Sequence, residues 1–200
     1  MSDVSDTLRV IQLIQAWGFH RDQGSWADLA DTFTVDGSIA VTWFCGRHGD
    51  FIERCRATHK ERSPRGKHLI GVPVVRLAGD KAVAETNVQI LGRVSLDGIA
   101  VDNTSHARFL DRLVRTGSGW RIARRDAIYE KDRLDPVVPS EAFDRFMRET
   151  DFSAVPEPYR YLGYRLLQTG RSLVAGILED GSPEALAMLE DARSWLAQAG

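Results

Sequence analysis

Histidine side chains are the first candidates for chemistry in this sequence. The five histidines stand at positions 20, 48, 59, 68 and 106, without the local spacing of a metal site. Because an imidazole titrates near neutral pH, a histidine that faces a pocket can act as a general base. His68 opens a predicted strand, so the alternative is a hydrogen-bonded histidine at a strand start.

Arg125 is the second candidate, because its neighbours would leave space beside it. It lies in the segment WRIARRDA, whose alternation places Arg121, Ala123, Arg125 and Ala127 on one face of a strand. A guanidinium next to two small alanines can hold a carboxylate, a phenolate or a departing anion. The alternative is a solvated arginine on an exposed sheet face.

Other catalytic chemistries lack their motifs. The sequence contains no G-x-S-x-G, H-E-x-x-H, G-x-x-x-x-G-K or G-x-G-x-x-G. Cys45 and Cys55 do not have the spacing of metal ligands, and we expect both to be reduced structural residues. We therefore expect neither a metal nor a cofactor.

Length and charge limit the classes of partner. The 200 residues are enough for one good core or two small ones. A formal net charge of −2, with dispersed Lys and Arg, gives no footprint for nucleic acid. No apolar stretch approaches the roughly 20 residues of a membrane helix, and residues 1–6 lack the features of a signal peptide. We expect a cytoplasmic protein that binds neither nucleic acid nor membranes.

The elements that would position these residues change in character along the chain. Apolar spacing predicts helices over 5–18, 25–33 and 49–62, with a strand over 38–44 after the Asp36-Gly37 turn. Ser5 and Gly18 are the expected ends of the first helix.

Residues 67 to about 131 predict an antiparallel meander. Its strands are expected over 67–77, 81–94, 99–115 and 119–130, with Asp97-Gly98 as a strong hairpin signal. Such a sheet buries one face, which the preceding helices must cover. The fold class is therefore α+β, a curved antiparallel sheet covered by N-terminal helices.

The last part of the chain, 136–200, predicts a helical extension. Helices are expected over 140–149, 157–178 and 182–198, and we expect the face with Tyr161 and Tyr164 to pack near the pocket entrance or on a neighbouring subunit. The extension covers only part of the outer sheet face, so we expect a homo-oligomer, a dimer or a trimer.

Three segments together resemble a known family. They are RDQGSWADLADTFTVDG (21–37), KHLIG (67–71) and HARFLDRLVRTGSGWRIARRD (106–126). Their order and spacing resemble SnoaL-like members of the nuclear transport factor 2-like superfamily. The resemblance covers residues 5 to about 135 and implies one cone-shaped domain over 1–135, followed by the extension over 136–200.

The resemblance also implies a catalytic pair. Scytalone dehydratase and hexachlorocyclohexane dehydrochlorinase use an Asp–His pair, which corresponds here to Asp22 and His68, and the pocket arginine of the dehydrochlorinase corresponds to Arg125. Two positions depart from scytalone dehydratase. Arg21 replaces its tyrosine, and its second catalytic histidine falls near Gly92. Scytalone itself is therefore not the expected substrate.

Six further residues are candidate contacts for a substrate. Two histidines and one acid could reach the pocket, and three aromatic side chains could form its walls; they are His20, His106, Asp111, Trp43, Phe44 and Tyr129. Each of them has an alternative as a core or surface residue.

Two functions of different classes follow. The first is a cofactor-independent lyase, either a dehydratase or a retro-aldol lyase, or an isomerase, acting on a small aromatic or polycyclic compound. The second is a non-catalytic binding or oligomerisation module of the same fold. An Asp22–His68 contact inside an enclosed pocket would favour the enzyme.

Overall fold

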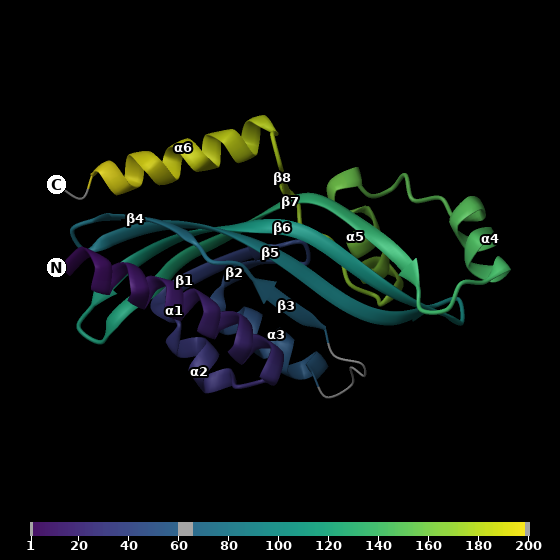
Figure 1. Cartoon of the computed structure of the whole chain (residues 1–200), viewed down its shortest axis with the longest axis horizontal. Coiled ribbons are helices and arrows are strands. Elements are labelled where there is room, and N and C mark those ends of the chain that lie inside the picture. Colours follow the sequence, from purple (N-terminus) through teal and green to yellow (C-terminus); the bar gives the residue numbers. More distant parts are fainter. Residues whose placement is uncertain (1, 60–65, 199–200) are drawn as a thin grey trace.

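One curved sheet positions every other element of the chain (Figure 1). The computed structural model describes residues 2–59 and 66–198. Within them, eight strands form the order β2-β1-β7-β6-β5-β3, while β4 also pairs with β5 and β8 with β7. The strands are β1 (Phe33–Val41), β2 (Phe44–Arg47), β3 (Lys67–Ile70), β4 (Val74–Ala78), β5 (Lys81–Leu96), β6 (Ile99–Thr116), β7 (Gly119–Pro136) and β8 (Leu178–Glu179).

The three long strands confirm the predicted antiparallel hairpins. β5 and β6 pair from Lys81↔Val114 to Leu96↔Ile99. Asp97 and Gly98, which connect them, have φ of 48° and 81°, the positive values that a tight hairpin turn requires. The sheet is not purely antiparallel, however, because β1 runs parallel to β7.

Some predicted boundaries were wrong because of contacts between distant segments. The first helix continues past Gly18, where a Cβ would lie 2.5 Å from Ile70 Cγ1, so this glycine permits close packing of the helix on β3. The strand expected over 67–77 is divided into β3 and β4, with Pro73 between them. The helix expected over 157–178 ends at Gln168, and Gly170 follows with a φ of 73°.

The N-terminal helices cover one face of the sheet. They are α1 (Ser2–Gln23), α2 (Trp26–Asp31) and α3 (His48–His59); residues 60–62 of the predicted third helix lie outside the described residues. Val10, Ile14 and Trp17 of α1 are buried in the same core as Phe109 and Ile122 of the sheet. This face holds the larger core, as the amphipathic pattern predicted.

The helical extension packs on both faces and at one end of the sheet (Figure 1). It contains α4 (Glu141–Glu149), the short helix η1 (Glu157–Tyr159), α5 (Arg160–Gln168) and α6 (Pro183–Ala197). Ala185 and Ala192 of α6 contact the outer face, whereas Leu162 and Leu166 of α5 enter the larger core.

The tyrosine face of α5 packs against one end of the sheet. Tyr161 and Tyr164 contact Phe152, with ring centroids 5.2 and 5.0 Å apart, and Tyr164 also contacts Phe146 of α4. Both tyrosines join the cluster of Leu96, Val101 and Leu134 from β5, β6 and β7, so this face packs on the cone domain, one of the two expected alternatives. Packing on a neighbouring subunit stays a prediction.

Two hydrogen bonds attach α5 and the loop after it to the sheet. The Leu162 amide donates to Asp132 Oδ2 at 2.7 Å, and the Val174 amide donates to the Thr42 carbonyl at 3.0 Å.

No helix in the described part of the chain is long and apolar enough to cross a membrane. The homo-oligomer stays a prediction.

Substitution of Ala192 tests whether α6 belongs to the cooperative unit. Ala192 is fully buried, so we expect Ala192→Asp to place an unpaired charge against the sheet and to lower the melting temperature by about 4 °C or more. Ala197→Asp, at the exposed end of the same helix, should leave it nearly unchanged. Equal melting temperatures for the two variants, measured by calorimetry, would contradict this packing.

Candidate active site

A cavity of about 470 Å³ lies between the sheet and the helices. Its wall combines residues of α1, α3, the β1–β2 turn, β5 and α5, so it is assembled from the N-terminal part and the extension together. Apolar side chains from these elements include Trp17, Phe51, Ile90, Phe109 and Leu162. The volume is that of a typical small-molecule pocket.

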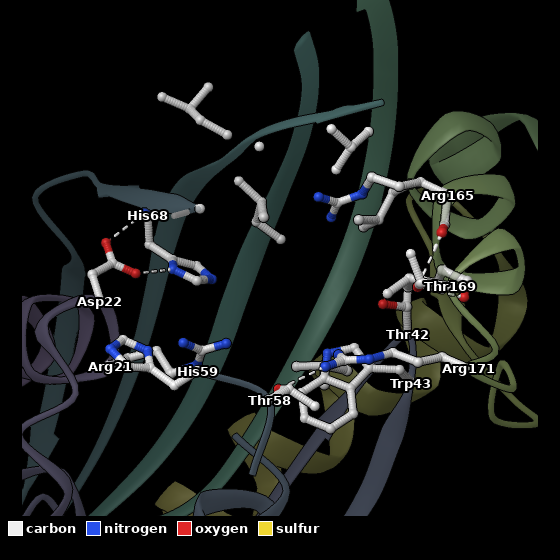
Figure 2. A pocket seen from close by; sticks show the side chains of 18 of the residues that line it. Arg21, Asp22, Thr42, Trp43, Thr58, His59, His68, Arg165, Thr169 and Arg171 are labelled. Carbon is white, nitrogen blue, oxygen red and sulfur yellow. Dashed lines mark hydrogen bonds and ion pairs between the residues drawn. The ribbon is translucent and has the colours of Figure 1, made fainter. Parts of the chain in front are cut away.

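Asp22 and His68 meet inside this cavity. His68 Nδ1 lies 2.6 Å from Asp22 Oδ1, and the His68 amide donates to Asp22 Oδ2 at 2.8 Å (Figure 2). The predicted hydrogen bond is therefore present, and both carboxylate oxygens bind the same residue. The side chains are 3% and 14% exposed, so the pair is largely shielded from solvent.

The two partners come from different layers of the fold. Asp22 lies in the last turn of α1, and His68 lies near the start of β3, which pairs with β5 through His68↔Ile90. Gly18, one turn earlier in α1, permits the close packing of helix and strand that brings the side chains together. Trp17 adds an edge-on ring contact to His68, with centroids 5.8 Å apart.

The geometry defines which ring nitrogen can act as a base. A carboxylate only accepts hydrogen bonds, so Nδ1 of His68 carries the proton and Nε2 carries the lone pair. In Figure 2 the second ring nitrogen points away from Asp22 into the cavity. Burial lowers the pKa of His68, and this effect is larger than the increase caused by the hydrogen bond to Asp22. The positive charge of Arg21 lowers the pKa further. The imidazole is therefore neutral at pH 7.

Arg125 is not in the cavity wall, and its predicted contact with a ligand requires correction. The side chain is fully buried and donates from Nε and Nη2 to Asp111 at 2.6 and 2.7 Å. Its guanidinium lies 4.3 Å from the ring centroids of both Trp17 and Phe109, which also contact each other edge-on. Asp111 is the direct cross-strand partner of Arg125 and neutralises it.

The alternation that grouped Arg125 with Arg121 and Ala123 was wrong, because the pairing of β7 with β6 shifts register at Ala123. This shift leaves Trp120 and Ile122 in the inner core.

Four of the six predicted substrate contacts also lie outside the cavity wall: Asp111, which pairs with Arg125, and His106, His20 and Phe44. His106 borders a separate depression with Gln89 and Glu130, because it is an odd number of residues from the inward-facing Phe109. His20 is two residues from Asp22, hence on another side of α1, and its Nδ1 is 3.9 Å from Asp28.

Phe44 is a core residue, whereas two of the predicted aromatic walls are present. Phe44 is buried beside Phe51 and Trp43. Trp43 and Tyr129 line the cavity, and the Tyr129 hydroxyl accepts a hydrogen bond from the Thr42 amide at 3.1 Å.

Two arginines of the extension that were not predicted also belong to the site. Arg165 of α5 and Arg171 of the following loop both line the cavity (Figure 2). Arg171 lies over the Trp43 ring at 4.4 Å and donates to Thr58 Oγ1 at 3.0 Å. The resemblance ends before these residues, and helical spacing alone does not show which side chains of α5 face a cavity.

Solved structures share the fold at low sequence identity. A protein of Novosphingobium aromaticivorans, provisionally described as a scytalone dehydratase, is 14% identical with a TM-score of 0.58, over 70% of this chain and all of that one. A Mycobacterium tuberculosis protein of unknown function is 17% identical with a TM-score of 0.55, over 87% and 95% of the two chains. These likenesses establish the fold alone.

Sequence relatives come from fungi. An uncharacterised protein of Emericella nidulans is 30% identical over 172 residues, 80% of this chain and 70% of that protein. Pea pathogenicity protein 2 of Fusarium vanettenii is 25% identical over 166 residues, 80% and 68% of the two chains. The family model of the SnoaL-like domain matches residues 2–126. The chain therefore belongs to the SnoaL-like family, as the resemblance implied.

Proposed function

We propose that this protein is an enzyme in which His68 acts as a general base and Asp22 supports it. The single observation that carries the proposal is the Asp22–His68 hydrogen bond in the wall of a partly open cavity, with the second ring nitrogen directed into the cavity. The reaction class that these groups suit is a cofactor-independent lyase or isomerase reaction on a small aromatic or polycyclic compound.

The proposed reaction needs one proton transfer in each direction. His68 Nε2 removes a proton from carbon or from a hydroxyl, and the Asp22 carboxylate stabilises the imidazolium that forms. In a dehydration, a C–O bond then breaks and the imidazolium returns the proton to the departing oxygen, which leaves as water. In an isomerisation the proton returns to another carbon, and in a retro-aldol cleavage it returns to the carbanionic product.

The buried position of Arg125 changes its proposed role. Its guanidinium is neutralised by Asp111 and separated from the cavity by Trp17 and Phe109, so it does not contact substrate in this proposal. It instead holds Trp17, which in turn contacts the His68 ring. Arg21, a cavity residue whose charge acts on His68, is the better candidate for stabilising negative charge beside the base.

A non-catalytic binding module is the alternative. The names of the fungal relatives assign no reaction to them, and the same cavity would suit a carrier. The enzyme is favoured because binding alone does not need a neutral imidazole that is oriented by a buried carboxylate.

The first test removes the proposed base and measures turnover. The substrate is an aromatic compound identified beforehand in a screen of diols and phenols. We expect His68→Ala to lower kcat by about 10²-fold to 10⁴-fold, with a smaller effect on substrate binding. His106→Ala is the matched control, because His106 lies outside this cavity and should leave kcat unchanged. Near wild-type turnover by a folded His68→Ala protein would exclude the mechanism.

The pH dependence of activity is the second test. The neutral imidazole is the active form, so kcat/KM should rise with pH and reach its plateau through a midpoint below 6.5, because burial lowers the pKa of His68. Asp22→Asn removes an interaction that raises this pKa, so the midpoint should move further down while the plateau falls. A wild-type midpoint above 7 would be inconsistent with the buried base.

The Arg125–Asp111 pair predicts a large stability effect. Asp111→Asn leaves a fully buried guanidinium without its counter-charge, which should cost about 3–5 kcal/mol of unfolding free energy. Asp191→Asn is the control, because Asp191 pairs with Arg112 at the surface and should matter little. Denaturant unfolding of both variants gives the comparison, and similar free energies would argue against the buried pair.

A further inference from the structure

The cavity wall carries more positive than negative side chains. Among the described residues that line it, four are arginines, and Asp22 is the one carboxylate; the arginines are Arg21, Arg93, Arg165 and Arg171. Arg93 pairs with Asp102 at 2.7 Å, and Asp132 lies near Arg165 below α5. Among the described residues, guanidinium groups outnumber carboxylates even when both of these acids are counted, and such an excess favours an anionic ligand.

Arg165 enters the cavity from the side opposite His68 (Figure 2). Its guanidinium lies against Gly92 of β5, where an added Cβ would collide with Nη1 and lie 3.3 Å from Cζ. This is the position near which the resemblance to scytalone dehydratase would place a second histidine. Here the glycine instead leaves space that a guanidinium from the extension fills.

We infer that the substrate of this site carries a carboxylate, which Arg165 binds while His68 acts at the other end of the molecule. The inference rests on the proposed function and names the substrate class. A guanidinium matches a planar carboxylate with two parallel N–H···O bonds. Apolar residues between the two ends, among them Phe51, Ile90 and Leu162, would contact the ring system.

Arg171 has a different place in this arrangement. It lies over Trp43 and donates to Thr58, so it connects the loop after α5 with α3 and the β1–β2 turn. Its charge adds to the positive wall, but Arg165 lies against β5, facing the dyad. Arg165 is therefore the residue to change.

A pair of probes that differ in charge tests the inference by binding alone. Calorimetry at pH 7.5 and constant salt compares naphthalene-2-carboxylate with its neutral carboxamide. We expect the wild type to bind the carboxylate at least about tenfold more tightly. Arg165→Gln should bring the ratio of affinities close to one, and Arg165→Lys should give an intermediate ratio because the charge remains without the planar fork.

Two further variants keep the outcome interpretable. Arg145→Gln removes the same charge from an exposed position of the extension and should keep the wild-type ratio. Gly92→Ala leaves every charge in place but occupies the space of the guanidinium, so it should weaken carboxylate binding several-fold with little effect on the carboxamide. It also serves as the test if Arg165→Gln does not fold.

The inference is overturned if the wild type binds the carboxylate and the carboxamide with equal affinity, or if it binds neither probe detectably. A carboxylate preference that persists in folded Arg165→Gln would overturn it as well. The inference and the proposed catalysis are tested separately. If both hold, His68→Ala loses turnover but keeps the preference for the carboxylate probe. A lost preference with intact His68-dependent turnover would reject the substrate class alone.

Discussion

The hydrogen bond between Asp22 and His68 is the interaction on which the site depends. It joins the last turn of α1 to the start of β3, so the helical layer and the sheet hold one reactive group between them. Burial keeps the imidazole neutral, and the carboxylate directs its lone pair to the cavity. The same bond thus serves the packing of two layers and the proposed chemistry.

A second layer of interactions lies beneath this pair. The Arg125 guanidinium, neutralised by Asp111, packs against both Trp17 and Phe109, and Trp17 contacts the His68 ring. A buried ion pair is costly to assemble but stiff once formed, because each charge holds the other in place. This arrangement fixes Trp17 and Phe109, which form the part of the cavity wall next to His68.

The extension completes the cavity. Leu162 and Leu166 close its apolar wall, and Arg165 adds charge from the side opposite His68. Asp132 anchors the start of α5 by accepting from the Leu162 amide, although burial raises the pKa of this carboxyl to about 6. The part of the chain outside the family model therefore supplies part of the cavity wall.

Local sequence patterns predicted the features that depend on neighbouring residues. Asp97-Gly98 indicated the β5–β6 hairpin. The distant pair of Asp22 and His68 was indicated by the family resemblance and not by a local pattern. Other features that depend on distant contacts were missed or misplaced. Gly18 was expected to end a helix, but it permits the packing of Ile70. Simple alternation grouped Arg125 with Arg121 and Ala123, but the shift at Ala123 and the pairing of Arg125 with Asp111 depend on strand register, which the sequence pattern does not give.

The side chains of the extension were the least predictable. Helical spacing showed that α5 has an apolar face, but it did not show that Tyr161 and Tyr164 pack with Phe152 at one end of the sheet. The orientation of Arg165 follows from how α5 docks on the sheet and from the space that Gly92 leaves. Neither is visible in a local pattern.

The ¹⁵N chemical shifts of the His68 ring, followed as a function of pH, test the central claim most directly and need no substrate. His68→Ala assigns the signals. The account predicts a neutral ring at pH 7 with its proton on Nδ1, a lone pair on Nε2 and a titration midpoint below 6.5. An imidazolium at pH 7, or a neutral ring with the proton on Nε2, would contradict it.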